Sequence, residues 1–143
     1  MIGLDTNVLV RYYVAQNHGN GHGDAATAAQ CEAARQLIDG GKRLMVSKTV
    51  VLELEWVLRG RYELTLRQLG QVFAHLLSLG HVQIEDRTAV QLAISSMAQG
   101  FDFADALHHA SYRICDSVVT FDDKGFSRRA KKAGWKPAVQ LLR

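Results

Sequence analysis

The sequence predicts an α/β fold with an open, parallel β-sheet and helices on both of its faces. Short apolar runs, some of them β-branched, alternate with longer segments in which the apolar residues follow a helical period. One or two helices separate successive strands, and this order is typical of parallel β-α-β units. The chain has 143 residues, of which 48% are hydrophobic, and this suits a substantial core. We therefore expect a single domain over residues 1–143.

The expected strands are short and mostly apolar. They are Ile2–Leu4, Arg43–Val46, His81–Glu85, Ser117–Thr120 and residues 137–142. The fourth of these is rich in β-branched residues, and the third alternates apolar with polar residues, as strands do. Pro137 opens the last segment, and proline favours the edge of a sheet because it has no N–H to donate.

The expected helices fill the intervals between the strands. They cover residues 6–14, 24–39, 47–59, 65–79, 87–99, 102–114 and 122–132. Asp24, Ser47 and Thr65 are good N-caps, and a glycine pair at 40–41 ends the second helix. Residues 16–23, QNHGNGHG, are rich in glycine and asparagine and predict a loop.

The cysteines and the apolar runs bear on the cellular compartment. Cys31 and Cys115 lie far apart in helical patterns, which predicts free, buried thiols rather than a disulfide framework. The sequence contains no run of about 18 apolar residues, so it predicts no transmembrane helix. The N-terminus lacks the pattern of a signal peptide. We therefore expect a protein of the reducing cytoplasm.

Positive charge is concentrated near the C-terminus. The net charge is +3, and residues 124–143 contain no Asp or Glu. The basic residues that lie nearest one another there are Lys124, Arg128, Arg129, Lys131, Lys132 and Lys136. A basic face suits a phosphate backbone through Coulomb attraction and counterion release. A solvated helix face is the alternative.

Aspartates stand where predicted strands end and helices begin. Asp5 follows the first strand, and Asp122 and Asp123 follow the fourth. In open α/β sheets, ligands bind at this carboxyl edge. Asp102 and Asp105 open a helix, with Asp102 as its cap and Asp105 at the third helical position. Each aspartate alone is also well explained as a helix cap or a first-turn acid.

Convergence of these acids at one sheet edge would favour a metal site. The strands that precede Asp5 and Asp122 are possible neighbours in this topology. Carboxylates that meet repel one another and raise one another's pKa, so the cluster is costly without a cation. Oxygen ligands of high charge select Mg²⁺ or Mn²⁺. The sequence has no Cys/His spacing that predicts zinc.

The segment VSKTVVLELEWVLRG adds two further acids, Glu53 and Glu55. The apolar stripe of this helix consists of Val50, Val51, Leu54, Val57 and Leu58. The glutamates flank the stripe on opposite sides, so spacing does not choose between them. Two solvated border charges are the alternative.

Four segments occur in the order and spacing of PIN-domain motifs: MIGLDTNVLVRYYV, VSKTVVLELEWVLRG, DFADALHHA and VVTFDDKGF. The chain resembles PIN-domain proteins nearly end to end, and in particular the VapC-type ribonucleases, the toxins of toxin–antitoxin pairs. The resemblance implies a three-layer α/β/α PIN-like domain with a central parallel sheet. The first and third motifs are the more specific, since each places an acid in a characteristic apolar frame.

The resemblance also implies a catalytic quartet of acids, which is here Asp5, Glu53, Asp105 and Asp122. It selects Glu53, with Glu55 as the fallback, and it leaves Asp123 as an alternative fourth acid. Asp5 and Asp105 match the principal ligands of Mg²⁺ or Mn²⁺. Asn7 and Thr120 match polar residues that often orient the acids. The implied reaction is hydrolysis of RNA by metal-activated water, which leaves a 5′-phosphate and a 3′-hydroxyl.

The resemblance implies macromolecular partners as well. RNA is the substrate, and its backbone is expected to contact Arg11 and the basic residues Lys124, Arg128, Arg129, Lys131 and Lys132. A cognate antitoxin protein and a homodimer are also expected. Trp56 and the Leu-rich helix at 65–79 are either a face for such a partner or part of the core.

Other functions compete with this interpretation. A haloacid-dehalogenase-like phosphatase also places Asp after its first strand, but it normally adds a second Asp where this chain has Asn7. A receiver-type signalling domain needs paired acids and a later lysine, and neither is visible. A catalytically silent PIN module that binds RNA or protein is the remaining alternative, and only an activity assay separates it from a nuclease.

Overall fold

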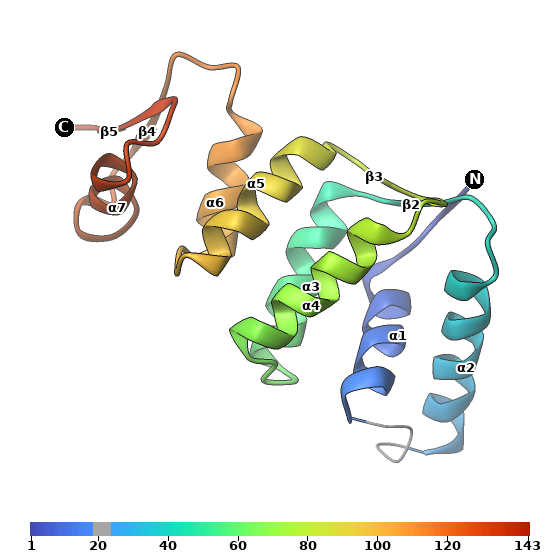
Figure 1. Ribbon diagram of the computed structural model, residues 1–143. Coiled ribbons are helices and arrows are strands. Elements are labelled where there is room, and N and C mark those ends of the chain that lie inside the picture. The colour runs from blue at the N-terminus through green and yellow to red at the C-terminus, as the bar shows by residue number, and fades with distance from the viewer. Residues whose placement is uncertain (19–23) are drawn as a thin grey trace. The chain divides into compact units, whose positions relative to one another are not determined.

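The computed structural model describes residues 1–18 and 24–143, which form two compact units. The N-terminal unit comprises Met1–Arg87, and the C-terminal unit comprises Thr88–Arg143 (Figure 1). Each unit contains parallel strands connected through helices. The predicted α/β class with parallel strands is therefore confirmed. A single domain over the whole chain stays a prediction.

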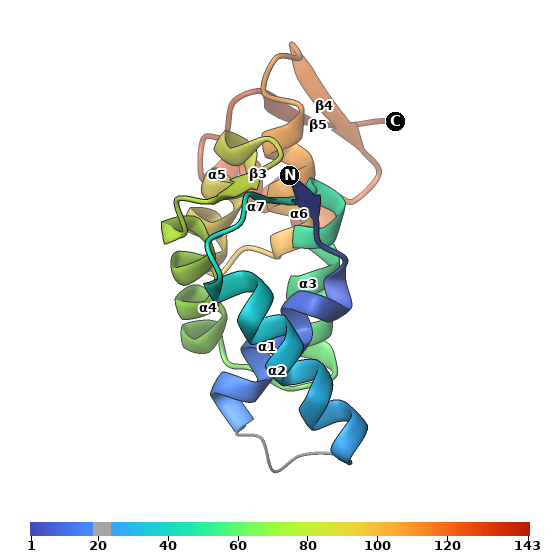
Figure 2. The same cartoon turned by 90° about the vertical axis from the view of Figure 1, so that its right-hand side faces the viewer.

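The N-terminal unit is built on a parallel sheet with the strand order β1-β2-β3. Its elements are β1 (Ile2–Gly3), α1 (Thr6–His18), α2 (Ala25–Asp39), β2 (Leu44–Val46), α3 (Lys48–Gly60), α4 (Leu66–Ser78) and β3 (Val82–Ile84). Leu44 is the Cα partner of Ile2 on one side and of Val82 on the other. Helix α1 packs against α2 and α3, and the first of these pairs lies side by side in both views (Figure 1, Figure 2).

The C-terminal unit pairs β4 with β5 in parallel. Its elements are α5 (Arg87–Ala98, which starts on the last residue of the N-terminal unit), α6 (Phe103–Ser111), β4 (Ser117–Thr120), a π-helical turn η1 (Asp123–Ser127), α7 (Arg128–Lys132) and β5 (Ala138–Leu141). The N–H of Leu142 donates to the carbonyl of Thr120 at 2.8 Å, so the pairing reaches the end of β4. The strand expected at 137–142 is therefore present.

The predicted N-caps are in place. Ser47 Oγ accepts the Val50 N–H at 3.2 Å, and Asp24 Oδ1 accepts the Thr27 N–H at 2.9 Å. Thr65 forms a full capping box with Gln68, because the side chain of each accepts the backbone N–H of the other. These short-range bonds explain why the helix starts follow from the sequence alone.

Helix α4 contributes its apolar face to the core of the N-terminal unit. Leu69, Val72, Phe73 and Leu76 are all buried. These four side chains therefore belong to the core, and the alternative that they form a face for a partner is wrong. Trp56 is different, because it is 65% exposed on α3.

Some boundaries and burials differ from the predictions. Helix α1 continues to His18, so residues 16–18 of the predicted loop are helical; the rest of that loop, residues 19–23, lies outside the described residues. Helix α6 ends at Ser111, and the following residues, including Tyr112 and Ile114, are exposed, so they have no core to cover. Both thiols are free, but Cys115 is exposed and Cys31 is half-buried, so the prediction of buried thiols is wrong. Within the described chain, no helix has the length and apolar character needed to cross a bilayer.

Candidate active site

Asp5 stands at the carboxyl end of β1. The N–H of the preceding Leu4 still donates to the carbonyl of Met45 at 2.9 Å, so the chain leaves the sheet at Asp5. Asp5 Oδ1 accepts the N–H of Thr6 at 2.8 Å, which orients the carboxylate at the start of α1. The residue is exposed. The structure thus gives Asp5 the strand-end position that the sequence predicts.

Glu53 and Glu55 have different environments. Glu53 is exposed and lines a pocket of about 240 Å³ together with Asp5, and we call this the N-unit pocket. Glu55 is 3% exposed, and Arg59 Nε donates to its Oε2 at 2.8 Å. The interpretation of Glu55 as a solvated border charge is therefore wrong. The structure brings Glu53, and not Glu55, to the pocket of Asp5.

Thr6 supplies a buried hydroxyl at the N-unit pocket. The residue is 5% exposed, and its Oγ1 has no hydrogen-bond partner among the described residues. Leaving such a group unpaired costs about 1–3 kcal/mol, so it is a feature that calls for a ligand or a water molecule. Asn7, predicted as a supporting polar residue, lines the same pocket.

The C-terminal unit gathers three aspartates at a second pocket. Asp102, Asp105 and Asp122 line a space of about 140 Å³, which we call the C-unit pocket. Asp102 Oδ1 accepts the Asp105 N–H at 2.9 Å, so Asp102 is the predicted cap of α6 and Asp105 is the third helical residue. From the sequence, Asp102 is expected only as a cap, although its D-x-x-D spacing places it near the start of the same helix as Asp105.

The charge of Asp105 is disfavoured by its surroundings. Partial burial raises the pKa of this carboxyl, and the negative charges of Asp102 and Asp122 raise it further. His108 and Arg129 oppose the shift. An uncompensated carboxylate of this kind is expected where a cation normally completes the site.

Asp122 is held at the start of η1 by backbone hydrogen bonds. The N–H groups of Phe126 and Gly125 donate to its two carboxylate oxygens at 3.0 and 2.9 Å, and they lower its pKa. Thr120 Oγ1 accepts the backbone N–H of Asp122 at 3.1 Å, so it holds the backbone of this residue, and its role in orienting the acids stays a prediction. Asp123 is exposed and does not line the C-unit pocket.

Replacement of Gly125 by alanine is expected to displace the Asp122 carboxylate. A Cβ at position 125 would lie 2.7 Å from Oδ2 and 3.1 Å from Oδ1 of Asp122. We expect the RNA cleavage that the resemblance implies to fall about 10–100-fold, the range seen when a group that orients a metal ligand is lost. Cleavage rates of purified variants measure this. Gly70→Ala is the control, because a Cβ there has no heavy atom within 4 Å. Full activity in Gly125→Ala would show that the position of Asp122 is unimportant.

Basic side chains accompany the acids in both units. Lys124 and Arg129 line the C-unit pocket, and Arg129 Nη1 donates to the carbonyl of Gly100 at 3.3 Å. Arg128, Lys131 and Lys132 are exposed on α7. This short helix therefore presents the predicted basic residues at the surface.

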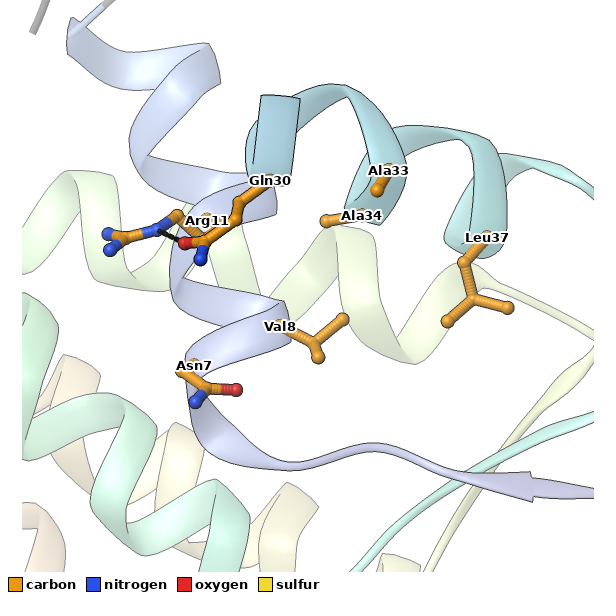
Figure 3. Close-up of a pocket in the computed structure, with 7 residues that line it drawn as sticks. All are labelled: Asn7, Val8, Arg11, Gln30, Ala33, Ala34 and Leu37. Carbon is orange, nitrogen blue, oxygen red and sulfur yellow. Dashed lines mark hydrogen bonds between the residues drawn. The ribbon is translucent and has the colours of Figure 1, made fainter. Parts of the chain in front are cut away.

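Arg11 lies on α1 between two pockets of the N-terminal unit. It lines the N-unit pocket and also a neighbouring space of about 320 Å³ between α1 and α2 (Figure 3). Its Nε donates to Gln30 Oε1 at 2.8 Å, as the dashed line in Figure 3 shows. This contact fixes the guanidinium without neutralising its charge.

The donors at both pockets fit a hard divalent cation. The N-unit pocket offers carboxylates and a hydroxyl, and the C-unit pocket offers carboxylates only. Within residues 1–18 and 24–143, no group of three or more His, Cys, Asp or Glu side chains is arranged to hold a metal ion by itself. The meeting of Asp5 and Glu53 with Asp105 and Asp122 stays a prediction, because each pair belongs to its own unit.

Thr6 lines the N-unit pocket although the sequence did not single it out, and the same is true of Arg61 and Tyr62. Arg61 and Tyr62 follow the last residue of α3, so they stand outside the helical stripe that identified Glu53. Their only signal in the sequence was the dipeptide RY directly after the VLRG that closes the motif.

The family model described as PIN domain matches residues 2–132. No curated protein and no solved structure matches the chain. The match covers most of the sequence, and the chain therefore belongs to the PIN domain family.

Proposed function

We propose that the protein is an endoribonuclease that depends on Mg²⁺ or Mn²⁺ and hydrolyses phosphodiester bonds of RNA. PIN domains are generally nucleases and typically use divalent metals. The observation that carries the proposal is that the predicted acids line pockets that also contain basic side chains. Asp5 and Glu53 share the N-unit pocket with arginines, and Asp105 and Asp122 share the C-unit pocket with Lys124 and Arg129.

The acids have distinct roles in this proposal. Asp5 and Asp105 are the principal ligands of the cation, and Glu53 and Asp122 complete or orient its shell. A bound divalent ion supplies a nucleophile from water near neutral pH and offsets negative charge in the transition state. Asp122 is suited to its role because two N–H groups hold its carboxylate and keep it ionised. The proposal requires both pairs of acids to act at one phosphodiester bond.

The basic residues have the role of holding RNA. Lys124 and Arg129 are adjacent to the acids, and the exposed charges of Arg128, Lys131 and Lys132 extend the basic surface on α7. Contacts of this kind bind the backbone without reading the sequence, so they do not select a particular RNA. Selection of the cleavage sequence must come from other residues.

Incubation of the purified protein with total RNA tests the proposal. We expect cleavage with Mg²⁺, its loss with EDTA and its return with excess Mg²⁺, because the acids need a cation to act. The fragments should carry a 5′-phosphate, which a 5′-phosphate-dependent exonuclease detects. The Asp5→Asn variant, purified in parallel, controls for contaminating nucleases. Cleavage that resists EDTA and survives in this variant would contradict the proposal, whereas RNA binding without cleavage would favour the silent PIN module.

We also propose, from the resemblance to VapC-type ribonucleases, that the protein is the toxin of a toxin–antitoxin pair. An antitoxin protein and a second copy of the chain are then its expected protein partners, since cyclic dimers are the commonest oligomers. A neighbouring small gene for a DNA-binding antitoxin would support this role, and a gene neighbourhood without one would speak against it.

A further inference from the structure

We propose that Arg61, together with Arg11, binds a phosphate group of the RNA strand in the N-unit pocket. The inference rests on the proposed function, because that function makes RNA the ligand. It adds a substrate-binding residue, Arg61, beside the acids Asp5 and Glu53. These four residues line the same pocket.

The arginines and the acids of the N-unit pocket do not neutralise one another. Among the described residues, no ion pair joins Arg11 or Arg61 to Asp5 or Glu53. Other acids of the same unit do form ion pairs. Glu55 is one of them, with its Oε2 2.8 Å from Nε of Arg59. The pocket therefore keeps positive and negative charges apart. Such a pocket suits a cation on the carboxylates and an anion on the guanidinium groups.

Each arginine is positioned by a contact that leaves its charge intact. The guanidinium of Arg61 lies 5.7 Å from the centroid of the Tyr62 ring, within the range of a cation–π interaction. The backbone N–H of Arg61 donates to the carbonyl of Val57 at 2.9 Å, and this bond fixes the backbone at the end of α3. Arg11 is held by Gln30 (Figure 3). Preorganised guanidinium groups lose less side-chain entropy when they bind.

Phosphate is the ligand that this geometry favours. A guanidinium has five N–H donors in a planar fork that matches two phosphate oxygens, and it cannot bind a cation. The buried hydroxyl of Thr6, which has no partner among the described residues, is compatible with this ligand, because a hydroxyl can donate to a phosphate oxygen. Thr6 is also the first residue of α1, whose N-terminus favours negative charge.

Binding of a single-stranded RNA oligonucleotide tests the inference. Fluorescence anisotropy in EDTA, over a series of salt concentrations, gives the slope of log K against log salt. Each phosphate contact contributes about −0.7 to this slope on a single strand. We expect Arg61→Gln to make the slope shallower, by about 0.7 where the phosphate contact is lost completely, and to raise KM in Mg²⁺ with little change in kcat. Arg61→Lys, which keeps the charge, should restore the slope.

Arg67→Gln is the matched control, because Arg67 is exposed on α4 and does not line the N-unit pocket. Its slope and KM should equal those of the wild type. If the wild type cleaves RNA and Arg61→Gln has the same slope and KM as the wild type, this inference is wrong and the proposed function is unaffected. A wild-type protein that binds RNA but does not cleave it would refute the proposed function, while the slope still decides the role of Arg61. A wild-type protein that does not bind RNA would refute both.

Discussion

Asp5→Asn is expected to abolish RNA cleavage and leave the protein folded. The substitution keeps the size of the side chain but removes the charge that would hold a cation at the end of β1. Asn can still accept the Thr6 N–H that Asp5 Oδ1 accepts at 2.8 Å, so the start of α1 is retained. We expect the cleavage rate to fall by at least about 10²-fold, as for the loss of one electrostatic group of an active site. Timed cleavage of a labelled RNA measures the effect.

Asp105→Asn, a substitution in the C-terminal unit, is expected to reduce RNA cleavage as Asp5→Asn does. Burial and neighbouring carboxylates raise the pKa of Asp105 in the folded protein. The ionised form therefore disfavours folding at neutral pH, and the melting temperature of Asp105→Asn should be no lower than that of the wild type. Substantial cleavage by either Asn variant, prepared free of metal and then refilled, would contradict the proposed roles of these acids.

Glu53→Gln and Glu55→Gln are expected to have opposite effects. Glu53 is exposed at the N-unit pocket, so its loss should reduce cleavage strongly and change stability little. Glu55 is buried and paired with Arg59, so its loss should reduce stability and change cleavage little. The cost for Glu55→Gln is about 1–2 kcal/mol, because Arg59 is half-exposed and regains water.

Thermal unfolding and cleavage assays of both variants test this contrast. A destabilisation of this size lowers the melting temperature by a few degrees in a chain of this length, roughly 2–4 °C per kcal/mol. Each glutamate serves as the control for the other, because they are two residues apart on α3. If Glu55→Gln lost cleavage at a temperature where it is fully folded and Glu53→Gln kept it, Glu55 and not Glu53 would be the catalytic acid.

Much of the fold follows from local features of the sequence. Ser117–Thr120 was predicted as a strand with its observed boundaries, and the caps Ser47 and Thr65 are in place, because β-branched runs and capping bonds depend on neighbouring residues. The end of α6 and the exposure of Cys115 were not predicted, because they depend on which surfaces the core covers. The π-helical turn after Asp122 has no signal in the apolar periodicity.

The candidate site shows the same division. Asp5 and Asp122 were placed correctly at strand ends because the alternation of strands and helices is visible in the sequence. Helical spacing left Glu53 and Glu55 equivalent, and only tertiary packing buries one and exposes the other. Arg61 was missed because its place in the pocket depends on the packing of α1 against α3.

Mn²⁺ binding by the full chain tests the central claim most directly. Isothermal titration calorimetry of the wild type, Asp5→Asn and Asp105→Asn compares the acids of the two units. We predict that either substitution alone abolishes or strongly weakens Mn²⁺ binding, because the proposed function requires the acids of both units to hold the same cation. Unchanged Mn²⁺ affinity in either variant would contradict the claim.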